Sequence, residues 1–268
     1  MSDPWHLPNL IILNFEENNL TGPIPTKFFN ISSLQKISSA KNSLFGNLPL
    51  DTGLLSCPNL ETLYFGGNKL SGSIPSDLSN CSNLVDVDFS TNLLSGPIPK
   101  SLGNLKYLQI LYLIDNKLIG EGGDQEPNFL SSLSNCLFLE ELGISFNSLN
   151  ITITDSIGNL SVSLRYFIAG YNQIKGQIPM GIGSFKKLTI LHLSSNKLTG
   201  NIPSTLGELE GLERLHLREN NIGGYIPEVL CLLRKLGEIF ISDNKISRSI
   251  PNCIGNLSRL QRLNIQLD

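Results

Sequence analysis

The sequence has no long apolar run and little charge of either sign. Of its 268 residues 16% are charged, and the formal net charge is −3. The longest purely apolar stretch is a few residues, as from Leu10 to Leu13, whereas a membrane-spanning helix needs about 20. We therefore expect no membrane span in this chain. Phosphate binding needs a basic face, so we also expect no nucleic-acid partner.

Catalytic signatures are missing as well. The chain has only three His, and it contains no phosphate-binding loop G-x-x-x-x-G-K-[ST], no H-E-x-x-H, no G-x-S-x-G and no kinase signature set. We predict that the chain itself is not an enzyme and that it uses no cofactor.

Leucine and asparagine are in excess, at 48 and 28 residues, and both recur at a fixed period. The pattern L-x-x-L-x-L-x-x-N-x-L-x-G-x-I-P is complete from Leu188 to Pro203. Its Asn occurs at ten positions, most of them 24 residues apart: Asn18, Asn42, Asn68, Asn92, Asn116, Asn147, Asn172, Asn196, Asn220 and Asn244. This period predicts a single repeat array over residues 1–268, with about ten repeats and a partial repeat at each end.

Each position of the repeat has a physical reason. The alternation Leu191-His192-Leu193 is strand periodicity, with both Leu pointing inward and His192 outward. A unit of 24 residues cannot bury its apolar side alone, so neighbouring units must stack in parallel. The Asn side chain both donates and accepts, and we expect it to bond backbone groups of its own coil and the adjacent coil.

These motifs resemble those of plant leucine-rich-repeat ectodomains found in receptor-like kinases, over practically the whole chain. The L-x-G-x-I-P segment resembles the plant-specific repeat. The segments from Asn128 to Cys136 and from Ser156 to Ser161 resemble the immune-receptor subfamily that senses microbial patterns. The resemblance implies an α/β repeat solenoid: a right-handed superhelix with a concave parallel sheet, a second short strand at Gly-x-Ile-Pro and an irregular or 3-10 convex side.

The resemblance also implies a role. We expect an extracellular repeat region that binds a peptide or protein on its concave face, in defence or development signalling, with a co-receptor ectodomain as a further partner. One alternative is a secreted inhibitor of a cell-wall-degrading enzyme, similar to the polygalacturonase-inhibiting proteins. Another is a truncated receptor fragment without a function of its own.

The ends of the chain favour a fragment. Both ends fall inside a repeat, and neither carries the paired-cysteine cap usual in the family. We find no signal peptide and no targeting signal, and no kinase domain follows. We expect the parent protein to lie at the plasma membrane or cell wall, facing outward.

The repeat is interrupted between Asn116 and Asn147, where the gap is seven residues too long. The extra length is a polar, Gly-containing loop at residues 121–127. It is either a tolerated surface insertion, which costs little, or a loop that contacts a partner. In the next repeat, Ile151-Thr-Ile-Thr154 replaces the Gly-x-Ile-Pro signature.

Strand alternation identifies the outward residues of the concave face. The acids outnumber the bases, most clearly from Asp86 to Glu141, which would attract a cationic partner. The acids are Glu16, Glu17, Glu61, Asp86, Asp88, Asp115, Glu140, Glu141, Glu213, Glu219, Glu238 and Asp243, and the bases are Lys36, Lys41, Arg165, Arg214, Arg218 and Arg262. Rigid aromatic side chains on a polar sheet suit peptide recognition. Our candidate ligand-binding residues are Tyr64, Asp88, Tyr112, Phe146, Tyr171, His192, His216, Arg218 and Phe240, with Tyr166 as a further outward aromatic.

His192 and His216 are 24 residues apart, so we expect them to be neighbours on adjacent strands. Three interpretations are open. They are ordinary contact residues, or a pH sensor whose two imidazoles charge and repel, or a metal pair completed by Glu213 or Glu219. We expect the first, and therefore no metal.

The cysteines and the N-x-S/T glycosylation acceptors bear on the cellular compartment in which the protein is found. Cys57, Cys81 and Cys136 each precede a repeat Asn by eleven residues, which indicates small buried apolar residues. A Cys57–Cys81 bridge is geometrically allowed, but we expect all five Cys, including Cys231 and Cys253, to be core or near-core thiols. The resemblance to an extracellular family implies glycosylation of some of the six acceptors, which are Asn19, Asn30, Asn80, Asn150, Asn159 and Asn256.

Overall fold

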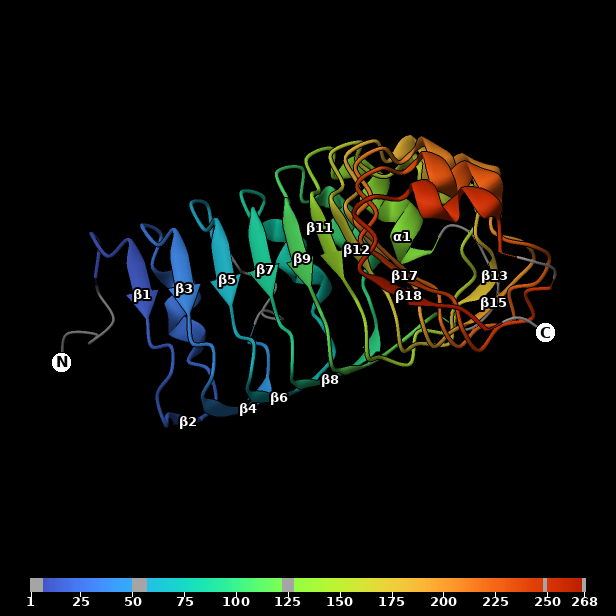
Figure 1. The fold of residues 1–268 in the computed structure, drawn as a ribbon. Coiled ribbons are helices and arrows are strands. Elements are labelled where there is room, and N and C mark those ends of the chain that lie inside the picture. The colour runs from blue at the N-terminus through green and yellow to red at the C-terminus, as the bar shows by residue number, and fades with distance from the viewer. Residues whose placement is uncertain (1–6, 50–56, 122–127, 248–249, 267–268) are drawn as a thin grey trace.

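The main feature of the computed structural model is a parallel sheet of eleven three-residue strands, one from each coil of the chain. The structure describes residues 7–49, 57–121, 128–247 and 250–266. The strands are β1 (Ile12–Asn14), β3 (Lys36–Ser38), β5 (Thr62–Tyr64), β7 (Asp86–Asp88), β9 (Ile110–Tyr112), β11 (Glu141–Gly143), β12 (Tyr166–Ile168), β14 (Ile190–His192), β16 (Arg214–His216), β17 (Glu238–Phe240) and β18 (Arg262–Asn264). Figure 1 shows them side by side along a curved array with the two termini at opposite ends.

Short strands from the L-x-G-x-I-P segments form two further parallel sheets. One contains β2 (Thr21–Gly22), β4 (Ser43–Asn47), β6 (Lys69–Gly72), β8 (Leu93–Pro97) and β10 (Lys117–Ile119), and the other β13 (Lys175–Gln177) and β15 (Lys197–Thr199). They are separated at the repeat with Ile151-Thr-Ile-Thr154, which joins its neighbours only by the single bridges Ile119↔Ser148 and Thr152↔Lys175. The loss of Gly-x-Ile-Pro thus interrupts this row.

Single 3-10 turns form the convex side, most of them beginning directly after the Pro of the repeat. They are η1 (Thr26–Asn30), η2 (Ser76–Asn80), η3 (Lys100–Asn104), η4 (Leu133–Asn135), η5 (Asp155–Asn159), η6 (Met180–Ser184), η7 (Ser204–Glu208), η8 (Glu228–Leu232) and η9 (Asn252–Asn256). One α-helical turn, α1 (Phe129–Ser132), is capped by Asn128, whose side chain accepts from the backbone N–H groups of Leu130 and Ser131. The predicted solenoid class is therefore confirmed.

A continuous apolar core lies between the concave sheet and the 3-10 turns. Leu191 and Leu193 are buried and His192 points outward, as the alternation predicts. Towards the N-terminus aromatic rings extend this packing from coil to coil, with Phe65 stacked on Phe89 at 6.1 Å between ring centroids. No helix of the described residues is long and apolar enough to cross a membrane.

Each repeat Asn after the first joins its own coil to the preceding one. Asn196 donates from Nδ2 to the carbonyl oxygens of Leu193 and Ser194 in its own coil and of Ala169 in the preceding coil. Its Oδ1 accepts from the Ile174 N–H at 2.9 Å. The predicted bonding to the same and the adjacent coil is confirmed.

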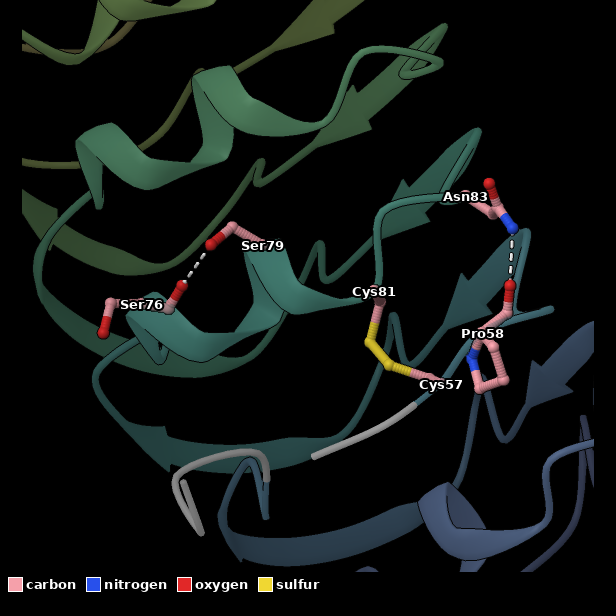
Figure 2. Close-up of a disulfide and its surroundings, with 6 residues drawn as sticks. All are labelled: Cys57, Pro58, Ser76, Ser79, Cys81 and Asn83. Carbon is pink, nitrogen blue, oxygen red and sulfur yellow. Dashed lines mark hydrogen bonds between the residues drawn. A yellow bond between two sulfur atoms is a disulfide. The ribbon is translucent and has the colours of Figure 1, made fainter. Parts of the chain in front are cut away.

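Two disulfides correct the expectation that every cysteine is a thiol. Cys57 and Cys81 are bonded with their Cα atoms 5.0 Å apart, as Figure 2 shows, and Cys231 and Cys253 are bonded at 5.7 Å. Residues one repeat apart lie on adjacent coils at this spacing, which matches the Cα separation of a disulfide. Cys136 alone remains a buried free thiol, because the matching residues of the adjacent coils are Leu105 and Ser161.

The loop insertion predicted at residues 121–127 lies almost wholly outside the described residues, so its two interpretations stay open.

Candidate ligand-binding surface

Five of the nine candidate residues form one row of rings on the concave face. Phe146 stacks on Tyr171 at 4.2 Å between centroids, and Tyr171 contacts His192 edge-on at 6.1 Å. His192 contacts His216 at 5.4 Å, and His216 stacks on Phe240 at 4.5 Å. The strand register pairs His192 with His216 and His216 with Phe240, as the repeat spacing predicted. We call these five residues the ring row.

The row is continuous because a glycine makes room for it. A Cβ atom at Gly170 would lie 2.7 Å from Nε2 of His192, so any larger residue would displace that imidazole. Gly143 does the same for Tyr112, whose Cδ1 lies 2.7 Å from the Cβ position. Both rings therefore lie against bare backbone of the neighbouring coil.

Phe146 and Tyr171 hold a backbone conformation that aromatic residues rarely adopt. Their φ angles are 55° and 54°, in the left-handed region. Each directly precedes a repeat Asn, and eight other residues in this position also have positive φ, among them Gly67. This conformation costs a non-glycine residue about 1–2 kcal/mol. Two bulky rings nevertheless occupy it, and they are 49% and 43% exposed, so their position favours contact with a partner over packing in the core.

The ring orientations determine what a ligand would meet. The planes of Phe146 and Tyr171 differ by 9° and those of His216 and Phe240 by 11°, so each pair covers its own facing surfaces. A ligand on the sheet would therefore contact ring edges. Apolar or planar groups suit such edges, because ring edges carry partial positive charge and prefer edge-to-face contacts.

The two imidazoles are largely buried, and a carboxylate contacts one of them. Burial and, secondarily, His216 lower the pKa of His192 to about 4. Burial also lowers the pKa of His216, against the opposing effect of Glu238, whose Oε2 lies 3.0 Å from Nε2. His216 thus pairs with Glu238 and not with Glu213 or Glu219. Within the described ranges, no group of three or more His, Cys, Asp or Glu side chains is placed to hold a metal ion.

We expect the His192 ring to titrate near pH 4 in an NMR experiment. The ring of His192 contacts Tyr171 and His216, and the nearest carboxylate of this row, that of Glu238, contacts His216 instead. The lowered pKa means that the folded state favours neutral His192. The contribution of His192 to the free energy of unfolding is therefore complete above its pKa in the unfolded chain, near 6.5, and is lost as the pH falls toward 4. Replacement of His216 by Gln should raise the His192 midpoint. A His192 midpoint near 6.5 in the wild-type protein would contradict this environment and revive the pH-sensor hypothesis.

Five of the six cations of this face are paired with acids, mostly from an adjacent coil, whereas Lys36 lies over the Tyr64 ring. Arg218 bonds Asp243 at 2.9 Å and Glu219 at 2.8 Å, and Arg262 bonds Glu238 at 3.1 Å. Arg165 lies 3.6 Å from Glu140. Arg218 therefore borders the ring row as part of an ion-pair network.

The other candidates form a second cluster, of acids and tyrosines, toward the N-terminus. Tyr64, Asp88 and Tyr112 face one another across β5, β7 and β9 in the same register. The Tyr64 hydroxyl donates to Asp86 at 3.3 Å, and the Tyr112 hydroxyl donates to Glu141. Burial and nearby carboxylates raise the pKa of Tyr64 to about 12, and burial raises that of the Asp86 carboxyl. The structure thus separates the nine candidates into an acidic cluster and the ring row with Arg218.

The six N-x-S/T acceptors Asn19, Asn30, Asn80, Asn150, Asn159 and Asn256 are all exposed. Glycosylation at each position is therefore sterically open, and it stays a prediction.

Comparison with known protein families agrees with this architecture. Models described as leucine rich repeat match residues 186–246 and the stretches 9–31, 59–81 and 83–105. The chain is a leucine-rich-repeat solenoid. It contains no catalytic domain among the described coils, and its 3-10 turns and long parallel sheet are those of the class.

Its relatives are plant receptors. A putative leucine-rich repeat receptor-like serine/threonine-protein kinase of Arabidopsis thaliana is 41% identical over 68% of the chain and 19% of its own length. Receptor kinase-like protein Xa21 of Oryza sativa subsp. japonica is 36% identical over 34% of the chain and 9% of its own length. Our chain is thus a distant homologue of plant leucine-rich-repeat receptors and spans less than a fifth of these relatives.

A solved structure, the plant peptide hormone receptor RGFR1 in complex with RGF2, superposes with a TM-score of 0.83. It is 36% identical, and the match covers 90% of our chain and 37% of the receptor chain. The repeat region therefore resembles a receptor ectodomain solved with its peptide hormone.

Proposed function

We propose that this leucine-rich-repeat region is the extracellular ligand-binding part of a plant receptor-like kinase and that it recognises a peptide on its concave face. The observation that carries the proposal is the ring row, in which Phe146 and Tyr171 hold unfavourable backbone conformations while remaining half exposed. The relationship to plant receptors supports the location outside the plasma membrane, as do the two disulfides, which persist in oxidising compartments. Defence or development signalling and a co-receptor partner belong to the same proposal.

The dimensions of the row suit an extended peptide. It spans five adjacent coils, and coils repeat at about 5 Å, so it is roughly 20 Å long, which matches about six extended residues. The acidic cluster with Asp86, Asp88 and Glu141 adjoins it on the N-terminal side. The ligand would place apolar or planar side chains on the ring edges and a basic residue toward these carboxylates.

A phage-displayed peptide library panned on the chain tests the proposal. Selected peptides should bind the variants Tyr171→Asn and Phe240→Ala at least tenfold more weakly than the wild type, as measured by calorimetry, because rigid aromatic anchors dominate such interfaces. Asn tolerates the left-handed conformation, so Tyr171→Asn should change the unfolding free energy by no more than about 1 kcal/mol.

The matched control is Tyr107→Ala, which removes an exposed tyrosine outside the concave face and should leave peptide affinity unchanged. Peptides that bind both ring-row variants as tightly as the wild type would disprove this site, as would a library that yields no binder.

A further inference from the structure

A row of two-residue turns leads into the concave strands and forms one rim of the solenoid. Equivalent positions can be compared across eleven coils: Pro8-Asn9, Ser32-Ser33, Pro58-Asn59, Ser82-Asn83, Lys106-Tyr107, Leu137-Phe138, Val162-Ser163, Lys186-Lys187, Glu210-Gly211, Arg234-Lys235 and Ser258-Arg259. Proline and small polar residues fill the first four turns, and the last four are mostly charged. Only the three turns between them carry large apolar side chains.

These apolar side chains are strongly exposed. Tyr107 and Phe138 are each 53% exposed, Leu137 is 67% exposed and Val162 is 66% exposed. Tyr107 and Phe138 hold the same position in adjacent coils, and so do Leu137 and Val162. We call these four residues the rim patch. Tyr107, Leu137 and Phe138, together with Lys106, line one shallow hollow across two coils.

The rim patch lacks a hydrogen bond that two other rim turns make to the turn before them. Asn83 donates from Nδ2 to the Pro58 carbonyl of the preceding turn, as Figure 2 shows. Asn59 makes the same contact with the Ser32 carbonyl at 2.8 Å. Tyr107 and Phe138 occupy the equivalent positions and cannot donate in this way. The sequence thus replaces a bridging amide by exposed apolar surface, which has no use in a free monomer.

Two of the three turns of the rim patch, Lys106-Tyr107 and Leu137-Phe138, lack the glycosylation acceptor that the Val162 turn and three other rim turns have. Four coils end their 3-10 turn with an Asn whose acceptor Ser is the first residue of the rim turn or directly precedes it: Asn30 with Ser32, Asn80 with Ser82, Asn159 with Ser161 and Asn256 with Ser258. Asn104 and Asn135 end their turns in the same way, but Lys106 and Leu137 stand where Ser or Thr would be needed. The other rim turns without such an acceptor, at residues 8–9, 58–59, 186–187, 210–211 and 234–235, carry proline, glycine, polar or charged residues and no apolar patch. This argument rests on the proposed extracellular location.

The charges at the margin of the patch are positive. Lys106 lies within the hollow, and Lys186 and Lys187 follow Val162 in the next coil. Lys186 is paired with Glu208 at 2.6 Å, whereas no ion pair is found for Lys106 or Lys187 within the described residues. An incoming surface with carboxylates at its edge would be complementary to these ammonium groups.

We propose that the rim patch is a docking site for a second protein, separate from the peptide surface, whose contact area is apolar and bordered by carboxylates. The patch stands on the side of the solenoid, so a partner can occupy it while the concave face holds its ligand. An apolar centre with a charged rim is the usual anatomy of a protein interface.

Photo-crosslinking from the patch identifies the partner. The chain, secreted as a glycoprotein from plant cells, carries p-benzoylphenylalanine in place of Tyr107 or, as the matched control, of Lys235 on the same rim. We expect one protein to crosslink from position 107 and not from position 235, through a segment that contains apolar residues next to Asp or Glu. Equal crosslinking from both positions, a second copy of this chain, or a segment without such residues would overturn the proposal.

Glycan placement then tests the site with the identified protein in recombinant form. Leu137→Thr and Lys106→Thr create acceptors at Asn135 and Asn104, and a glycan there should weaken partner binding at least tenfold. The control Leu232→Asn/Arg234→Thr places a glycan on the same rim three or more coils away and should have no effect. Phe138→Asp, which needs no glycan, should weaken binding similarly by repelling the partner's carboxylates. Unchanged affinity in glycosylated Leu137→Thr and in Phe138→Asp would refute the site.

The two proposals fail separately. Peptide binding to the concave face should survive every rim variant, whereas ring-row variants should retain the rim partner. Mass spectrometry that finds Asn80 and Asn159 without glycans would count against the extracellular location and leave the crosslinking result to decide the rim patch alone.

Discussion

Replacement of Asn220 by Ala should lower the free energy of unfolding by about 3 kcal/mol, because it leaves a buried donor without a partner. Asn220 Oδ1 accepts from the Leu198 N–H at 3.0 Å, and its Nδ2 donates to the carbonyls of Leu193 and Leu217. Both carbonyls keep a second amide donor, from Asn196 and Asn244. The Leu198 N–H has no such substitute, and Leu198 is fully buried.

The matched control is Asn18→Ala, measured in the same urea titration. Asn18 is exposed and donates to Phe15 and Glu16 of its own coil, so its loss should cost less than about 1 kcal/mol. Equal effects at the two positions would show that bonding between coils is not what the repeat Asn contributes.

Removal of the Cys57–Cys81 disulfide by double substitution with Ala should also cost about 3 kcal/mol. The bond closes a loop with a sequence separation of 24 residues, and loop closure of this length restricts the unfolded chain by an amount of that order. Removal of Cys231–Cys253, with a separation of 22, should have a similar effect.

Reducing conditions provide the control for the disulfides. With both bonds reduced in the wild type, its free energy of unfolding should differ from that of the Cys57→Ala/Cys81→Ala variant only by the packing contribution of two small side chains. Because Cys57 and Cys81 are buried whereas Cys231 and Cys253 are partly exposed, a mild dithiol should reduce the second bond first. Alkylation of Cys57 before Cys231, or an undiminished difference after full reduction, would contradict this explanation.

The sequence predicted the parts of the structure that follow from the repeat itself. Strand alternation placed Leu191 inward and His192 outward, and the period placed His192 beside His216. The position of each residue within the repeat also identified the outward aromatics, because the backbone follows the same course in every coil. These predictions succeeded because one local pattern determines both the strand and its neighbour.

Other features depend on geometry that the pattern does not encode. Phe146 and Tyr171 precede a repeat Asn, whereas His192 lies within a strand. The members of the ring row therefore occupy different positions of the repeat, and no single repeat position predicts the row. The left-handed backbone at Phe146 and Tyr171 recurs at the position before each repeat Asn, but the residue types found there, such as Thr91 and Glu219, give no sign of it. The spacing of Cys57 and Cys81 allowed a bridge, but their burial favoured thiols, and only the side-chain directions decide between the two.

The rim patch could have been found from the sequence by comparing all eleven turns. At this position of the repeat, Lys106-Tyr107 and Leu137-Phe138 stand where earlier coils have serine and asparagine. Recognising that exception required knowing which side chains are exposed, because leucine and phenylalanine elsewhere in the repeat are core residues.

The most direct test of the central claim is to map where a selected peptide lies on the protein. A peptide that carries a photo-crosslinking residue in its apolar segment should label β12, β14, β16 and β17 or the two residues Phe146 and Tyr171, and should not label the 3-10 turns. Labelling confined to the convex turns or to the rim, with the ring row untouched, would contradict the claim that this surface recognises the ligand.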